Sequence, residues 1–142
     1  TPRLSFSSNL SQADSVYTFS TSLMNKGIGP AIIKSAKIIA KDKIYPLDMD
    51  EFFKAAFPKL EAFGEFRKLY SIQEGNSLSA NETRILFAYE FNENQMRNIS
   101  HYLGVSEDFN LPFNIIIEYG SMYEENWRID SKSNGHPLQL DH

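Results

Sequence analysis

The chain has 142 residues, of which 42% are hydrophobic and 23% are charged, and it contains no cysteine. A chain of this length is typical of one domain and can bury roughly two-thirds of its surface without disulfide bonds or metal ions. The lack of cysteine excludes a disulfide framework, a thiolate zinc site and a cysteine nucleophile. Eleven Phe, seven Tyr and one Trp argue against intrinsic disorder.

The formal net charge is −4, and it is unevenly distributed along the chain. Residues 1–43 carry six basic and two acidic side chains, whereas the rest carries eight basic and sixteen acidic ones. A nucleic-acid-binding domain normally shows a basic footprint, so we expect no nucleic-acid partner. The lysines of the first 43 residues fit the solvated face of a strand better than a site for an anion.

Alternation of apolar and polar residues predicts that most of the chain is β-strand. The clearest pattern is at 83–91, where Ile85, Phe87 and Tyr89 share one face. Similar or weaker patterns bring the expected total to seven or eight strands; they lie at 4–6, 16–24, 31–41, 44–47, 66–72, 113–119 and 127–129. The run at 31–41 changes phase, which predicts a bulge. The expected core includes Tyr17, Phe19, Leu23, Ile85, Phe87, Tyr89, Ile115, Ile117 and Trp127.

Two stretches have the apolar spacing of short helices. Near 49–61, Asp48 can cap the N-terminus and Pro58 interrupts the end. Near 94–103, Gly104 is a natural C-terminal stop. Because the helices do not alternate with the strands, a parallel βαβ fold is disfavoured.

We therefore predict a mainly β fold, an antiparallel immunoglobulin-like β-sandwich of seven or eight strands with two short helical insertions. The sandwich is expected to form one domain over residues 1–131. Residues 132–142 are polar, and we expect them to form a partly disordered tail.

A resemblance to known proteins is carried by residues 25–31, which read N-K-G-I-G-P-A between two predicted strands. Asn and Gly tolerate positive φ in a tight connection, and Pro stiffens the entry into the next strand. The segment resembles the N-x-G-x-G-P-A turn of uncharacterised bacterial proteins in which a membrane-spanning N-terminal helix precedes an extracytoplasmic immunoglobulin-like sandwich. It is also similar to adhesion-related modules of the CARDB type. Segments 2–4, 78–83 and 117–123 agree with this pattern, whereas residues 80–82 lack the Gly that such proteins commonly carry before an acidic residue.

The resemblance implies a compartment and a role, although fold similarity does not transfer an activity. We expect the domain to lie outside the cytoplasm, in the periplasm or at the cell surface, tethered by an N-terminal anchor ahead of Thr1. The implied function is a non-catalytic interaction or structural module of a bacterial envelope protein. Its partner would be another envelope protein or a second copy of the chain. The alternative is a β-sandwich module that binds carbohydrate or another ligand.

The patterns of common active and metal sites are missing from the sequence. The three histidines lack metal-ligand spacing, and no nucleophile elbow or phosphate-binding loop occurs. Asp48, Asp50 and Glu51 lack the offsets of a calcium loop and fit the start of a helix better. Glu124 and Glu125 are adjacent and cannot flank a glycosidic bond. We expect no enzyme, no cofactor and no metal.

Aromatic residues supply the remaining candidates for a site. Five Phe fall within residues 52–66, and we consider Phe52, Phe53 and Phe63 as a contact surface for a partner. The same residues could instead cap one end of the core. Tyr119, Tyr123 and Trp127 are candidates for a platform that stacks on a sugar ring, provided that the chain does not reverse between them.

Overall fold

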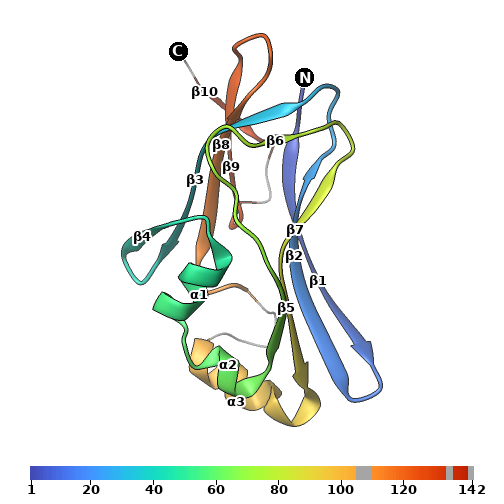
Figure 1. The fold of residues 1–142 in the computed structure, drawn as a ribbon, viewed down its shortest axis with the longest axis vertical. Helices are drawn as coiled ribbons and strands as arrows, with labels where there is room; N and C mark the ends of the chain where they lie inside the picture. Colours follow the sequence, from blue (N-terminus) through green and yellow to red (C-terminus); the bar gives the residue numbers. More distant parts are fainter. Residues whose placement is uncertain (105–109, 134–135, 141–142) are drawn as a thin grey trace.

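The chain folds into two antiparallel sheets that face each other as a β-sandwich (Figure 1). This computed structural model describes residues 1–104, 110–133 and 136–140. The first sheet contains, in spatial order, β1 (Leu4–Ala13), β2 (Val16–Asn25), β7 (Thr83–Asn92) and β5 (Glu65–Leu69). The second contains β10 (Leu138–Leu140), β9 (Asn126–Asp130), β8 (Asn114–Gly120), β3 (Ala31–Ala40) and β4 (Lys43–Pro46), and β6 (Ser77–Leu78) pairs with the start of β3.

The strand order is that of an immunoglobulin-like sandwich, in which strands A, B, E and D form one sheet and C, F and G the other. Here β1, β2, β7 and β5 take the places of A, B, E and D, while β3, β8 and β9 take those of C, F and G. The predicted fold class is thereby confirmed, although the strands number ten among the described residues. The extra two are β6 and β10, which are too short for an alternation pattern. Within the segment expected to form a partly disordered tail, residues 138–140 pair with β9.

Bulges set which residues of two strands face the core. In β3 the register with β8 shifts between Ile33 and Ser35, as the change of phase predicts. In β7 the pairing with β2 passes from Phe87 to Ile85 and skips Leu86. Leu86 is consequently fully buried and Ile85 only partly so, which corrects the prediction that Ile85 is a core residue.

Three helices and one 3-10 turn lie at the end of the sandwich opposite the N-terminus (Figure 1). They are α1 (Met49–Ala56), α2 (Leu60–Phe63), η1 (Glu93–Gln95) and α3 (Met96–Leu103). The side chain of Asp48 accepts a hydrogen bond from the backbone N–H of Glu51 at the start of α1, and Gly104 adopts the left-handed conformation (φ 67°) after α3. No helix formed by the described residues has the length and apolar character needed to cross a bilayer.

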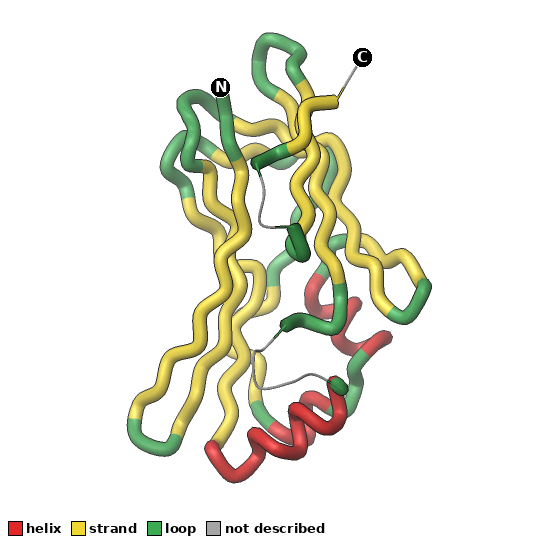
Figure 2. The backbone as a smooth tube through the Cα atoms, turned by 180° about the vertical axis from the view of Figure 1, so that it is seen from behind, coloured by secondary structure: helices red, strands yellow, loops and turns green. Residues whose placement is uncertain are grey.

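The core changes in composition along the sandwich. Near the N-terminus the two sheets lie close together, whereas toward the helices they diverge, and the helices and the segment before β8 lie between them (Figures 1 and 2). Aliphatic residues such as Leu23, Ile33 and Ile117 fill the narrow part and are fully buried. Phe rings fill the wide part, because a large side chain bridges a gap that an aliphatic one leaves open.

Candidate binding surfaces

Asn25 organises the connection between β2 and β3. Its side-chain oxygen accepts hydrogen bonds from the backbone N–H groups of Arg3 (3.1 Å) and Gly27 (3.0 Å), and its amide nitrogen donates to the carbonyl oxygens of Gly29 (3.0 Å) and Leu78 (3.1 Å). The residue is 0% exposed. One side chain therefore joins the start of the chain, the β2–β3 turn and the end of β6.

Two glycines of this turn are required by geometry. A Cβ atom on Gly27 would lie 2.3 Å from the carbonyl oxygen of Thr1 and 2.5 Å from the nitrogen of Arg3, so no side chain fits there. Gly29 has a φ of +86°, which L side chains rarely adopt. The motif at residues 25–31 thus has a structural explanation, in that each of its Asn and Gly positions shapes or fastens the turn.

Large apolar side chains are exposed at the end of the sandwich that the turn occupies. Ile28, in the β2–β3 connection, is 82% exposed, and Met122 and Tyr123, in the β8–β9 connection, are 71% and 86% exposed. Both connections lie at the end where the N-terminus lies (Figure 1). In an immunoglobulin-like sandwich the B–C and F–G connections lie at the same end, and they often carry binding residues. The β2–β3 and β8–β9 connections take these two places. We call these three residues the loop-end surface.

The β8–β9 turn is itself held in shape. The Ser121 hydroxyl accepts hydrogen bonds from the backbone N–H groups of Tyr123 (3.1 Å) and Glu125 (3.4 Å), and the Ser121 N–H donates to the Glu125 carbonyl oxygen at 2.9 Å. Glu124 takes a positive φ of 64°. Met122 and Tyr123 therefore project from an ordered turn.

The three Phe residues considered as a contact surface are not exposed as such a surface requires. Phe52 is 1% exposed and Phe53 is 5% exposed, so both are core residues. The ring centroid of Phe52 lies 4.9 Å from that of Phe113 and 5.2 Å from that of Tyr45, and Phe53 lies 4.6 Å from Phe66. Phe63 is partly buried and contacts the Tyr102 ring at 5.8 Å. The wide apolar stripe of α1 is covered because both sheets and the segment before β8 surround it.

The three aromatic residues considered as a sugar platform are separated by the fold. Tyr119 and Trp127 stack with ring centroids 5.7 Å apart, but both are buried, at 0% and 8% exposure. Tyr123 lies in the exposed turn between β8 and β9. The chain reverses between Tyr119 and Trp127, and their common face points into the sandwich. The predicted platform is therefore wrong.

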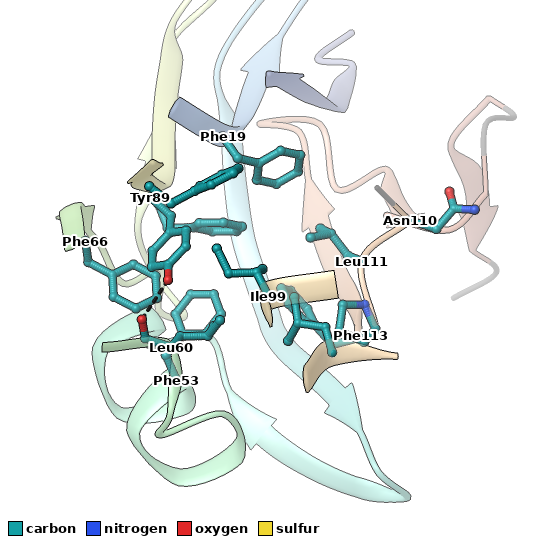
Figure 3. A pocket seen from close by; sticks show the side chains of 13 residues that line it. Phe19, Phe53, Leu60, Phe66, Tyr89, Ile99, Asn110, Leu111 and Phe113 are labelled. Atoms are coloured by element: carbon teal, nitrogen blue, oxygen red, sulfur yellow. Dashed lines mark hydrogen bonds between the residues drawn. The ribbon is translucent and has the colours of Figure 1, made fainter. Parts of the chain in front are cut away.

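An apolar pocket lies between the first sheet and the helices (Figure 3). Phe19, Tyr89, Ile99 and Leu111 are among the residues that line its volume of about 60 Å³. The Tyr89 hydroxyl is turned aside, donating to the carbonyl oxygen of Leu60 at 2.6 Å, and burial raises the pKa of this phenol. Small-molecule sites are typically several hundred Å³ with a few convergent polar groups. This pocket is too small and too apolar for a sugar.

A larger polar groove of about 500 Å³ runs between the start of β1 and the β9–β10 region. The Arg3 guanidinium contacts the Nδ1 atom of His136 at 2.8 Å, and Arg128 is paired with Glu118 at 2.9 Å. Asp130 is held by the side chain of Asn114 at 3.0 Å. Arg3, Arg128 and Asp130 of this groove therefore each already have a hydrogen-bond partner.

The acidic residues and histidines do not converge on a site. Asp48 caps α1, and Asp50 pairs with Lys54 at 3.2 Å on the same helix. His101 is exposed on α3. Within the described ranges no group of three or more His, Asp or Glu side chains could hold a metal ion. His142 lies outside the described residues.

Sequence reasoning missed the loop-end surface. Ile28 is flanked by Gly27 and Gly29 in a turn, a position where an apolar side chain has nothing to pack against. Met122 and Tyr123 similarly stand between the end of a strand and two glutamates. An apolar residue inside a predicted turn is therefore the sequence signal that indicates this surface.

Comparisons with known proteins provide no family for this chain. No protein-family model and no curated protein matches the sequence. A solved structure described as a crystal structure of a protein from Archaeoglobus fulgidus is 7% identical, over all of this chain and 94% of that chain, with a TM-score of 0.22. A similarity of this size supports no argument about fold or function, which therefore rests on the geometry described above.

Proposed function

We propose that this chain is a non-catalytic interaction or structural module of a bacterial envelope protein, and that it acts outside the cytoplasm. The observation that carries the interaction role is the loop-end surface, where Ile28, Met122 and Tyr123 are at least 71% exposed. Three large apolar side chains exposed at the same end of the sandwich are an unfavourable arrangement in water unless a partner covers them. The partner is a protein with a complementary apolar surface.

The rigidity of the two connections supports this proposal. Asn25 fastens one of them with four hydrogen bonds and Ser121 holds the other. A preorganised surface loses little conformational entropy on binding, so more of the contact energy appears as affinity. Tyr and Met are also enriched at protein interfaces.

The interaction role is tested by photo-crosslinking in the native host. A photoreactive residue replaces Ile28 in the full-length protein. The matched control carries it at Ile44, which is 68% exposed and lies in β4, the strand that pairs with the end of β3 away from the β2–β3 connection. We expect a discrete adduct from position 28 that disappears when Met122 and Tyr123 are both changed to Ser. An adduct of equal strength from position 44, or one unaffected by the Met122→Ser/Tyr123→Ser change, contradicts the role of this surface.

The identity of the crosslinked partner and a protease-accessibility assay together test the proposed compartment. Mass spectrometry of the adduct should identify an envelope protein, and protease added to intact spheroplasts should digest the domain. A cytoplasmic partner together with protection from protease would show that the domain is not extracytoplasmic, whatever the outcome for the surface itself.

A further inference from the structure

β1 forms a free edge of the first sheet and lacks the features that usually protect such an edge. It pairs with β2 over ten residues without a register shift, and no other strand among the described residues pairs with it (Figures 1 and 2). Its sequence, LSFSSNLSQA, contains no charged residue and no proline. Exposed edges normally carry lysine, proline, a bulge or a very short strand, because an unprotected edge recruits another strand.

The other edge strands among the described residues are protected by their shortness or their charge, and the shortest is β6, with two residues. β5 has Glu65, Arg67 and Lys68 within five residues and a register shift against β7. β4 has four residues and contains both Lys43 and Pro46. β10 has only three residues. Among these edge strands, β1 alone is both long and uncharged.

The backbone geometry shows which residues of β1 turn toward the free edge. The carbonyl oxygen of Arg3 accepts from the N–H of Lys26, whereas the N–H of Leu4 points away from β2 and donates to the Tyr119 hydroxyl. Hydrogen bonding alternates along an antiparallel strand. The N–H and C=O groups of Phe6, Ser8 and Leu10 therefore turn toward the edge.

We propose that β1 pairs antiparallel with β1 of a second copy, so that the two first sheets join into one sheet of eight strands. The two-fold axis passes beside Ser8, which then faces Ser8 of the second copy. In this register Phe6 lies opposite Leu10 of the second copy, and Leu10 opposite Phe6. Both are partly buried against the core in one copy, so the pairing extends the apolar layer across the axis.

A second copy suits this edge because the strand is self-complementary. A two-fold contact places each residue against its symmetry counterpart, and a charged strand would then bring like charges together. β1 has no charge to oppose. The loop-end surface lies on connections between other strands, so the dimer does not depend on the proposed function.

The contact is small. Strand pairing centred on five residues buries less than the ~1,200 Å² of a standard interface, so we expect a dissociation constant of about 10 μM to 1 mM. Sedimentation velocity between about 10 μM and 1 mM should show a reversible shift from monomer to dimer. A chain that remains monomeric over this whole range overturns the proposal.

Single-cysteine crosslinking tests the register, since the natural chain has no cysteine. Oxidation of Ser8→Cys should produce a covalent dimer, because the two thiols meet at the axis. Gln12→Cys is the matched control: it lies on the same edge and strand face, but its symmetry counterpart would be roughly 27 Å away at ~3.4 Å per residue. Crosslinking through position 12 at equal or greater yield overturns the proposed register.

A charge-swap experiment separates the contact from a loss of folding. Ser8→Lys and Ser8→Glu should each be monomeric, while an equimolar mixture should dimerise at least as well as the natural chain. Ser20→Lys adds the same charge one strand away from the edge and should leave dimerisation unchanged within twofold. Persistent dimers of Ser8→Lys alone, or no recovery in a mixture of folded variants, would show that β1 is not the interface.

Discussion

The hydroxyl of Tyr119 accepts a hydrogen bond from the backbone N–H of Leu4 at 3.2 Å. Tyr119 belongs to the second sheet and Leu4 to the first, so this bond joins the two layers inside the sandwich. Both residues are at most 1% exposed. The bond also satisfies an N–H group that β1 turns away from its strand partner.

Changing Tyr119 to Phe should lower the free energy of unfolding by about 1–3 kcal/mol, because the Leu4 N–H is left buried without an acceptor. Urea denaturation followed by circular dichroism measures the change. Tyr123→Phe, at a position 86% exposed, is the control and should have no measurable effect. Equal stability of the two variants would mean that the bond contributes nothing.

Changing Asn25 to Ala should destabilise the fold by at least about 3 kcal/mol, since four backbone groups lose their partner at a fully buried position. The matched control is Asn94→Ala, which removes an exposed amide. Guanidinium denaturation gives both values. A loss below about 1 kcal/mol for Asn25→Ala would show that water replaces the amide and that the turn does not depend on it.

Changing Phe52 to Ala should reduce the free energy of unfolding by about 3–5 kcal/mol, as expected for a large buried side chain. Ile44→Ala, at a position 68% exposed, should stay within about 0.5 kcal/mol of the natural chain. The comparison uses thermal and urea unfolding. If Phe52→Ala were as stable as Ile44→Ala, α1 would not be part of the core.

Acid should weaken the fold partly through Glu82. The Ser79 backbone N–H and the Arg84 guanidinium hold the pKa of this carboxyl below its usual value. A lowered folded-state pKa adds stability above the unfolded-state value near 4.5, and this stability is lost as the pH falls through the folded-state value. Urea unfolding between about pH 3 and pH 6 should therefore show a shallower decline for Glu82→Gln than for the natural chain. An identical decline contradicts the assignment.

Much of the sandwich could be predicted from local patterns, because a strand with one buried face must alternate. Alternation alone predicts that Phe87, Ile117 and Trp127 belong to the core, and all three are buried. Parity fails where a bulge inserts a residue, which is why Leu86 takes the place expected for Ile85. The bulge depends on the partner strand, and that pairing joins residues far apart in the sequence.

The candidate surfaces were harder to predict, because exposure depends on which layer covers a side chain. Phe52 and Phe53 form a stripe wider than one sheet would cover, but here the sheets diverge and several elements surround the helix. Tyr119 and Trp127 do share a face, as expected for one sheet, yet that face is the inner one. Alternation identifies a shared face without telling which side of the sheet it belongs to.

The order of strands in the first sheet also has a kinetic consequence. β1 and β2 are joined by a short turn and can form a hairpin early. The pairing of β2 with β7 forms later, because it joins residues far apart in the sequence, such as Val16 and Asn92. Local contacts form faster than distant ones. During refolding the hairpin therefore has two open sides, of which only one will later be covered by β7. Refolding yield should fall as protein concentration rises, and a lysine at position 8 should relieve that loss even at concentrations where the native chain is monomeric.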